Sequence, residues 1–244
     1  MNIEQDHKTI IKALQSGELA LQGQFVLGSN YTFLVETSFD TFKLMAVYKP
    51  SRGERPLWDF PTSSLAKREA AAYLVSKALG WQLVPPTIYR RQKAPLGPGS
   101  LQLFVEHEPD YQYFTFKNDI KQRLRPAAVF DILVNNADRK GGHILVDSQD
   151  HIWLIDHGLC FHHEDKLRTI LWDFSGEPIA DDLLSQVEAL VAQLEEKTAF
   201  YRTLARLISA VEISALCCRG RSLLTGRTFP FPSQEYRPYP WPPI

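Results

Sequence analysis

Asn135 to Gly158, NNADRKGGHILVDSQDHIWLIDHG, is the stretch that decides the fold. The apolar run PAAVFDILV leads into it and is typical of a buried helix. HILVD and HIWLID are typical of two short strands, and the turn residues SQD separate them. Asp138 lies in the polar loop before the first strand, and Asp156 ends the second. The two carboxylates are therefore expected to face each other beside one hairpin.

The same stretch carries residue types that suit the transfer of a phosphoryl group. A carboxylate at Asp138 can accept a proton from a hydroxyl group, and Lys140 can neutralise charge on the phosphoryl group. Asp156, followed by His157 and Gly158, can hold a divalent cation. A loop without chemistry is the alternative, but five polar residues and two glycines interrupt otherwise apolar segments. The stretch is therefore a candidate site.

The segments upstream are typical of strands. After a short helix over residues 8–15, the runs LALQGQFVLG, YTFLVET and FKLMAVYKP predict a three-stranded antiparallel meander. Gly28, Ser29 and Asn30 stand at the first hairpin tip, where backbone N–H groups can bind phosphates. Lys49 ends the third strand, where its ammonium group can reach the α- and β-phosphates of a nucleotide.

A helix is predicted over residues 64–81, with Ser64 as its N-cap and Gly80 at its end. Its apolar residues fall on one stripe, formed by Leu65, Ala72, Val75 and Leu79. Glu69 lies early in this helix, where its carboxylate can hold the Lys49 ammonium group in place. Either residue alone is more typical of an ordinary surface side chain. Their order along the chain is what favours a pair.

The remaining pattern divides the chain into three parts. PPTIYRR and SLQLFVEH add two strands, which gives residues 1–107 a five-stranded antiparallel sheet plus one helix. Residues 108–227 are mainly helical, with helices around LLSQVEALVAQLEE and FYRTLARLISAVEI. Residues 228–244 form a tail with six prolines, which excludes a helix or a central strand. Its Tyr236, Tyr239 and Trp241 are expected to pack onto the larger lobe.

Composition narrows the class of partner. The chain has 244 residues, 44% of them hydrophobic, and a net charge of −1 from 27 basic and 28 acidic side chains. It lacks the positive field that nucleic acid binding uses, so a small-molecule, lipid or protein substrate is favoured. Three cysteines form neither a disulfide framework nor a metal spacing, and no run has the length of a membrane span. A soluble, cytoplasmic protein is expected. The histidines between His143 and His163 suggest zinc only weakly, because their spacings match no known zinc pattern.

At these residues the chain resembles the phosphatidylinositol 3-/4-kinase-like superfamily. It is most similar to the type II phosphatidylinositol 4-kinases and the small uncharacterised bacterial proteins grouped with them. The resemblance runs from about Gly28 to Leu184. Four segments carry it: REAAAYLVSKALGWQLVPPTIY, GSLQLFVEHEPDY, FDILVNNADRKGGHIL and WLIDHGLCF. Their order and spacing are similar to the family's glutamate-bearing helix, hinge, catalytic loop and metal-binding loop.

This resemblance implies an α+β, two-lobed, protein-kinase-like fold that binds ATP with Mg²⁺ or Mn²⁺ between the lobes. It implies that Lys49 binds phosphates and that Glu69 pairs with it. The backbone of Phe104, Val105 and Glu106 would meet the adenine edge. Asp138 would be the catalytic base, and Asp156 the principal metal ligand.

Three departures from the family pattern stand out. His143 occupies the position, five residues after the catalytic aspartate, where an asparagine normally holds a second metal, so His143 is a candidate ligand that favours Mn²⁺. GERPLWDFP, at 53–61, has no counterpart in the eukaryotic lipid kinases. The cysteine-rich palmitoylated insertion of the type II enzymes is missing, so a lipid substrate is not carried over.

The expected function is an ATP-dependent kinase reaction, with the γ-phosphoryl group transferred to a hydroxyl of unknown identity. Two alternatives stay open on the same fold. One is a pseudokinase that binds nucleotide as a scaffold. The other is nucleotidyl transfer. The presence of Lys49, Glu69, Asp138 and Asp156 together favours catalysis.

Overall fold

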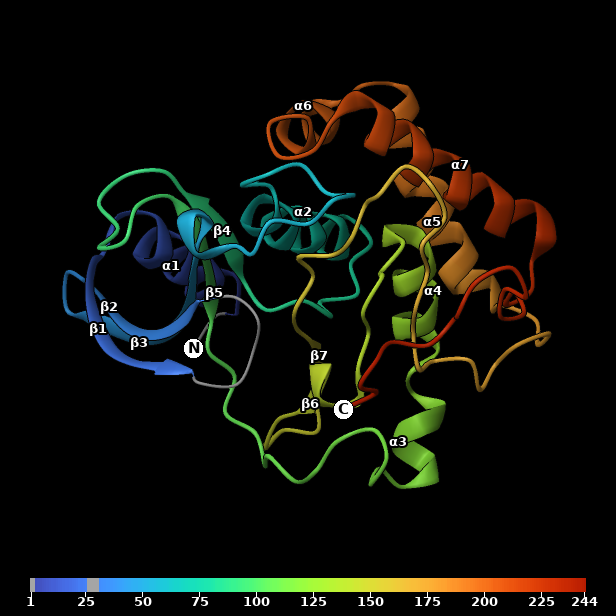
Figure 1. Ribbon diagram of the computed structural model, residues 1–244, viewed down its shortest axis with the longest axis horizontal. Coiled ribbons are helices and arrows are strands. Elements are labelled where there is room, and N and C mark those ends of the chain that lie inside the picture. Colours follow the sequence, from blue (N-terminus) through green and yellow to red (C-terminus); the bar gives the residue numbers. More distant parts are fainter. Residues whose placement is uncertain (1–2, 26–30) are drawn as a thin grey trace.

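The computed structural model describes residues 3–25 and 31–244. It has two lobes, a sheet-containing lobe at the left of Figure 1 and a mainly helical lobe at the right. This is the α+β, two-lobed architecture that the sequence predicted. The division of the chain at residues 107 and 227 remains a prediction.

The smaller lobe is built on a five-stranded antiparallel sheet. Its strands are β1 (Glu18–Phe25), β2 (Thr32–Phe39), β3 (Phe42–Pro50), β4 (Thr87–Arg90) and β5 (Gly99–Leu103), in the spatial order β1-β2-β3-β5-β4. Lys49 of β3 pairs with Ser100 of β5. The lysine therefore lies on a central strand with a neighbour on each side, which fixes the direction of its backbone.

Helix α1 (Ile3–Ser16) covers this sheet and is longer than the predicted 8–15. Arg90 donates to the carbonyls of Leu14 and Gly17, at 3.2 and 2.8 Å, and so ties the end of α1 to β4. The small core beneath the helix consists of Leu14, Val35, Ala46, Tyr48 and Leu101.

Helix α2 (Leu65–Ala78) belongs to a different and larger core. Its buried side chains occupy more than the single predicted stripe and pack with residues of the helical lobe. Alanines at 70–72 allow close approach on several faces at low cost in helix propensity. Gly80 ends the helix in the left-handed region, at φ +74°, as the sequence predicted. The helix that carries Glu69 therefore packs against both lobes, on β4 and β5 of the smaller lobe and on residues of the helical lobe.

The N-terminus of α2 corrects one expectation. The side chain of Ser64 makes no capping hydrogen bond to the helix. Glu54 instead accepts from the backbone N–H groups of Leu65 and Ala66, at 3.1 and 2.9 Å. A carboxylate satisfies two unpaired donors and also opposes the positive end of the helix dipole. The cap comes from a residue eleven positions away, which local sequence rules do not find.

The helical lobe surrounds the hairpin of β6 (Ile144–Val146) and β7 (Ile152–Leu154). Its helices are α3 (Asn118–Gln122), α4 (Arg125–Val134), α5 (Asp181–Glu195), α6 (Ala199–Leu204) and α7 (Ala210–Gly226). The helix expected around FYRTLARLISAVEI is two helices. The break is at Ser209, whose hydroxyl caps α7 while Glu212 reaches back to the Ser209 backbone N–H. Short 3-10 turns, η1 (Ser51–Gly53) and η2 (Gly141–His143), complete the chain.

The proline-rich tail runs from the end of α7 back to the middle of the molecule (Figure 1). Phe229 is its buried anchor. Two of the aromatic residues expected to pack, Tyr239 and Trp241, are exposed instead. Backbone carbonyls hold the tail in their place: Pro238 accepts from Thr169 N–H at 3.1 Å, and Pro243 accepts from Gly141 N–H at 2.8 Å. The tail therefore ends against the loop that contains Asp138.

Candidate active site

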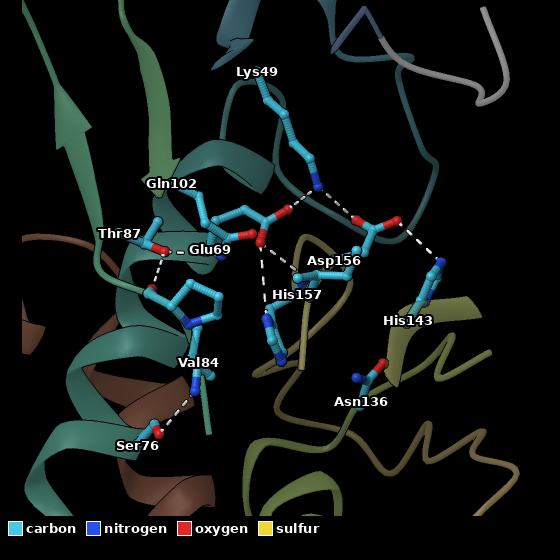
Figure 2. A network of polar contacts seen from close by, with 12 residues as sticks. Lys49, Glu69, Ser76, Val84, Thr87, Gln102, Asn136, His143, Asp156 and His157 are labelled. Carbon is cyan, nitrogen blue, oxygen red and sulfur yellow. Dashed lines mark hydrogen bonds and ion pairs between the residues drawn. The ribbon is translucent and has the colours of Figure 1, made fainter. Parts of the chain in front are cut away.

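Lys49 joins the two lobes. Its ammonium group lies 2.5 Å from Oε1 of Glu69 and 2.9 Å from Oδ1 of Asp156 (Figure 2). Strand β3, helix α2 and the segment after β7 thus each contribute one member of a charged triad. The structure brings together three of the residues selected from the sequence. They lie in one cleft between the lobes.

Lys49 and Asp156 are both charged at neutral pH, whereas burial raises the pKa of Glu69. The ammonium group of Lys49 holds the pKa of Asp156 well below its usual range, against the effect of burial. Burial lowers the pKa of Lys49, but the carboxylates of Asp156 and Glu69 outweigh it, and the net shift is upward. The cleft therefore presents a permanent cation beside a permanent anion.

Asp156 has an unusual backbone conformation, with φ of +60°. This left-handed region costs a non-glycine residue energy, and such residues gather at functional sites. The next residue, His157, donates its backbone N–H to Oε2 of Glu69 at 2.9 Å. Glu69 thus holds Lys49 with one oxygen and the turn at Asp156 with the other. That turn leaves the Asp156 side chain 48% exposed in the cleft.

Asp138 lies in the loop after α4, with a partly exposed carboxylate. Its backbone N–H donates to Oδ1 of Asn136 at 2.9 Å, and its Oδ2 lies 3.5 Å from the ammonium group of Lys140. Burial raises the pKa of Asp138 to about 6, while Lys140 opposes that rise. A carboxyl group with a pKa near neutrality is well matched to accepting a proton.

An ion pair that the sequence reasoning missed holds this loop in shape. Arg139 and Asp131 are fully buried, and the guanidinium Nε lies 3.1 Å from both carboxylate oxygens. Arg139 also donates to the carbonyl of Ile155 at 2.7 Å, and Thr169 donates to Asp131 at 2.9 Å. Asp131, an acid within the apolar run of α4, is the signal that could have revealed the pair, because buried charges are normally paired.

His143 stands on the other side of Asp156, with its Nε2 3.5 Å from Oδ2 (Figure 2). Its Nδ1 accepts from the backbone N–H of Lys140 at 3.4 Å. Burial lowers the pKa of His143 to about 4, so the ring is neutral at pH 7. With Nδ1 as the acceptor, the proton of the neutral ring lies on Nε2 and faces Asp156. A polar contact with Asp156 is thus a second role beside the predicted one of metal ligand.

The cleft itself forms a cavity of about 290 Å³. Phe104 and Val105 line it, and Phe104 N–H donates to the Met45 carbonyl at 3.0 Å. Glu106, the third residue expected to meet adenine, has an exposed side chain. Ser29 and Asn30, expected to bind phosphates, lie outside the described residues.

Residues 53–61, left without a role by the sequence, form a brace between α2 and residues 162–166. Asp59 lies 3.0 Å from the Lys166 ammonium group. Phe60 packs edge-on against His162 and faces the Arg68 guanidinium. Together with the Glu54 cap, which lies at the wall of the cleft, these contacts fix the start of α2.

The donor set suits a hard divalent cation bound together with a nucleotide. Within residues 3–25 and 31–244, no group of three or more His, Cys, Asp or Glu side chains is placed to hold a metal on its own. Mg²⁺ in kinases typically takes one or two carboxylates plus phosphate oxygens and water. The exposed carboxylate of Asp156, beside Lys49, provides such a partial site.

Comparison with known proteins identifies relatives. The family model of phosphatidylinositol 3- and 4-kinase matches residues 60–214. Protein Rv2133c of Mycobacterium tuberculosis is 43% identical over 94% of this chain and 93% of its own length. Phosphatidylinositol 4-kinase gamma 4 of rice is 31% identical over 52% of this chain, which spans only 26% of that kinase.

A solved structure supports the fold independently. The Golgi casein kinase with Mn/ADP bound superimposes with a TM-score of 0.58, covering 99% of this chain and 81% of that kinase. The identity is 13%, so the likeness is one of fold alone. Among the helices that the structure describes, none is long and apolar enough to cross a membrane.

Proposed function

The chain belongs to the phosphatidylinositol 3- and 4-kinase family, and we propose that it transfers the γ-phosphoryl group of ATP to a hydroxyl group of an acceptor. The observation that carries the proposal is the meeting of Lys49, Glu69 and Asp156 in one cleft. This is the arrangement that kinases use to bind phosphates and a metal ion. Family and fold support a phosphotransferase; ATP as donor is the finer step that we propose.

Each residue has a defined task in this reaction. Lys49 binds phosphate oxygens, and Glu69 keeps its ammonium group turned into the cleft. Phe104 and Val105 provide the wall against which the adenine ring packs. Asp156, with His143 beside it, would hold Mg²⁺ or Mn²⁺. The bound ion would neutralise charge on the phosphates.

The transfer step uses Asp138 and Lys140. The acceptor oxygen forms a bond to the γ-phosphorus, and the bond between that phosphorus and the β–γ bridging oxygen breaks, releasing ADP. Asp138 orients the hydroxyl and takes its proton, for which a pKa of about 6 is suitable. Lys140, 3.5 Å from Asp138, neutralises charge on the moving phosphoryl group.

Labelled nucleotides test the proposal. The purified chain is incubated with γ-labelled and, separately, α-labelled ATP, and protein, lipid and small-molecule fractions are analysed. Label from γ-ATP alone in an acceptor is expected, and Asp138→Asn should remove it. Transfer of the α-label would instead select nucleotidyl transfer. Tight ATP binding with neither label transferred would select a scaffold.

The lipid arm of this experiment has a specific reason. The rice relative is named as a phosphatidylinositol 4-kinase, but the present chain spans only about a quarter of its length. Phosphatidylinositol in mixed vesicles is therefore one acceptor to test among others. The name of the rice relative alone does not identify phosphatidylinositol as the acceptor of this chain.

A further inference from the structure

A pocket of about 540 Å³ lies between the tail and the helical lobe. We call it the tail pocket; its lining includes Tyr113, Phe114, Trp172, Asp173, Arg237 and Trp241. It is separate from the nucleotide cleft, whose lining residues are all different. The reaction proposed above leaves this pocket unused.

The tail pocket adjoins the catalytic loop. Gly141, three residues after Asp138, donates its N–H to the Pro243 carbonyl at 2.8 Å. A Cβ atom on Gly141 would lie 2.8 Å from the Phe114 ring, so the loop packs directly against one wall. The tail residue Pro238 accepts from Thr169, and the adjacent Arg168 accepts from Arg139 N–H at 2.9 Å. Both sides of the catalytic loop are thus tied to segments that form the pocket.

Its aromatic side chains are unusually open to solvent. Trp241 is 73% exposed, Phe114 48% and Tyr239 45%, although all three line this one depression. Exposed aromatic surface gathered at one place is typical of a binding site. The Arg237 guanidinium lies over the Trp241 ring, 4.7 Å from its centroid, and the buried Tyr113 donates its hydroxyl to Asp173.

The polar groups of the pocket narrow the chemistry of the ligand. Asp173 and Arg237 supply one carboxylate and one guanidinium, so the lining has no excess of either charge. An anionic ligand would need additional cations, and an acyl chain would remove water from the exposed guanidinium of Arg237 and carboxylate of Asp173 without replacing the hydrogen bonds to it. A neutral sugar ring avoids both problems. Its C–H face packs on an aromatic ring, and its hydroxyls exchange hydrogen bonds with a carboxylate and a guanidinium.

We propose that the tail pocket binds the acceptor, and that the acceptor is a neutral sugar, free or at the end of a larger molecule. This rests on the proposed kinase function. A sugar hydroxyl would form the new bond to the γ-phosphorus, its proton would pass to Asp138, and ADP would leave. The tail then determines which acceptor binds. Its hydrogen bonds to Thr169 and Gly141 fix the position of the pocket relative to the catalytic loop.

The test starts with direct binding, which does not depend on phosphoryl transfer. Glucose, galactose, mannose, maltose and their methyl glycosides are titrated into the full chain by calorimetry, without nucleotide. Binding of at least one is expected. Trp241→Ala should weaken it about tenfold, the equivalent of about 1.4 kcal/mol. Phe114→Ala, on the opposite segment, should weaken the same sugar. Trp58→Ala is the matched control, because Trp58 is 92% exposed on the brace outside the pocket lining.

Phosphoryl transfer is then measured with γ-labelled ATP and the sugar that binds. Transfer to the free sugar is compared with transfer to its methyl glycoside, which represents a sugar at the end of a larger molecule. ATP affinity, measured on the same preparations, reports on the kinase proposal alone. If ATP binds and no sugar of the panel does, the sugar inference is wrong while the kinase proposal stands. Equal sugar affinities for Trp241→Ala and Trp58→Ala would also overturn it. Sugar binding without any ATP binding would overturn the kinase proposal instead.

Discussion

Arg68 donates a hydrogen bond to the carboxylate of Glu212, and both side chains are buried between α2 and the start of α7. Arg68 also donates to the carbonyl of Cys160 at 2.5 Å. Because Glu69 is the next residue, this pair fixes the carboxylate that holds Lys49. Glu212 in turn closes the capping box of α7. One ion pair thus links the nucleotide cleft to the last helix.

Arg68→Met should lower the free energy of unfolding by about 3–5 kcal/mol, because it leaves a buried carboxylate without its partner. Chemical denaturation measures this. Arg221→Met is the matched control, since Arg221 pairs with Glu195 on the surface and such exposed pairs contribute little to stability. Similar losses for both variants would contradict the anchoring role.

Lys49→Met should weaken ATP binding about tenfold or more and leave the fold intact. The variant loses a charged hydrogen bond to phosphate, worth about 1.5–3 kcal/mol. It also leaves Glu69 and Asp156 as uncompensated negative charges facing the nucleotide. Calorimetry gives the affinity. Lys43→Met, which removes a lysine exposed on the same strand, should bind ATP like the unmodified chain. Unchanged affinity in Lys49→Met would remove the lysine from the site.

Asp138→Asn should abolish turnover while ATP affinity changes little. An amide matches the carboxylate in size but cannot accept the proton. Asp156→Ala is the contrasting variant, and it should remove metal-dependent nucleotide binding. Single-turnover transfer and calorimetry on both variants separate the two roles. Substantial turnover by Asp138→Asn would show that another group is the base.

The pH dependence of turnover should report on Lys140. Asp138 acts as a carboxylate, so activity is present above its pKa and is lost as pH falls through it. Burial raises this pKa to about 6, and the positive charge of Lys140 lowers it. Lys140→Met should therefore raise the pKa and move the acidic limb of kcat to higher pH. Lys140→Arg keeps the charge and should leave the limb in place. If the acidic limb of kcat lies at the same pH in Lys140→Met and Lys140→Arg, Lys140 does not lower the pKa of the catalytic base, and the roles assigned to Asp138 and Lys140 are contradicted.

His143→Asn should shift metal preference from Mn²⁺ toward Mg²⁺, because an amide oxygen replaces an imidazole nitrogen. The comparison is nucleotide affinity with each ion. Burial lowers the pKa of His143 to about 4, so the Mn²⁺ preference of the unmodified chain should persist down to about pH 5. His151→Asn, in the β6–β7 turn, is the control. If the preference does not change in His143→Asn, the histidine only contacts Asp156 and is not a metal ligand.

The residues recognisable from sequence are those whose local pattern carries the signal. Lys49 ends an apolar strand, Asp156 follows one, and Asp138 interrupts apolar segments, so each could be identified from its neighbours in the chain. Their order then matched a known family. The structure adds the distances and brings Lys49, Glu69 and Asp156 into contact.

The supports of the site were not recognisable, because their partners lie far apart in sequence. Arg68 and Glu212 are 144 positions apart, and a helical arginine alone suggests a solvated surface. Glu54 took the capping role that Ser64 was expected to have, through the fold of the brace. The break before α7 was readable, because Ser209 and Glu212 form a capping-box spacing.

The packing of α2 has a consequence for how the chain can be divided. The helix precedes β4 and β5 in sequence and packs against both, yet part of its buried surface is covered by residues that follow position 108. A fragment of residues 1–107 would expose that apolar surface, and we expect it to aggregate when expressed alone. During synthesis the sheet can pair early, but α2 has no complete cover until α6 and the start of α7 have left the ribosome. The smaller lobe is therefore a structural unit that does not fold on its own. Hydrogen exchange rates in α2 should resemble those of α4 and α7 more closely than those of β1 and β2.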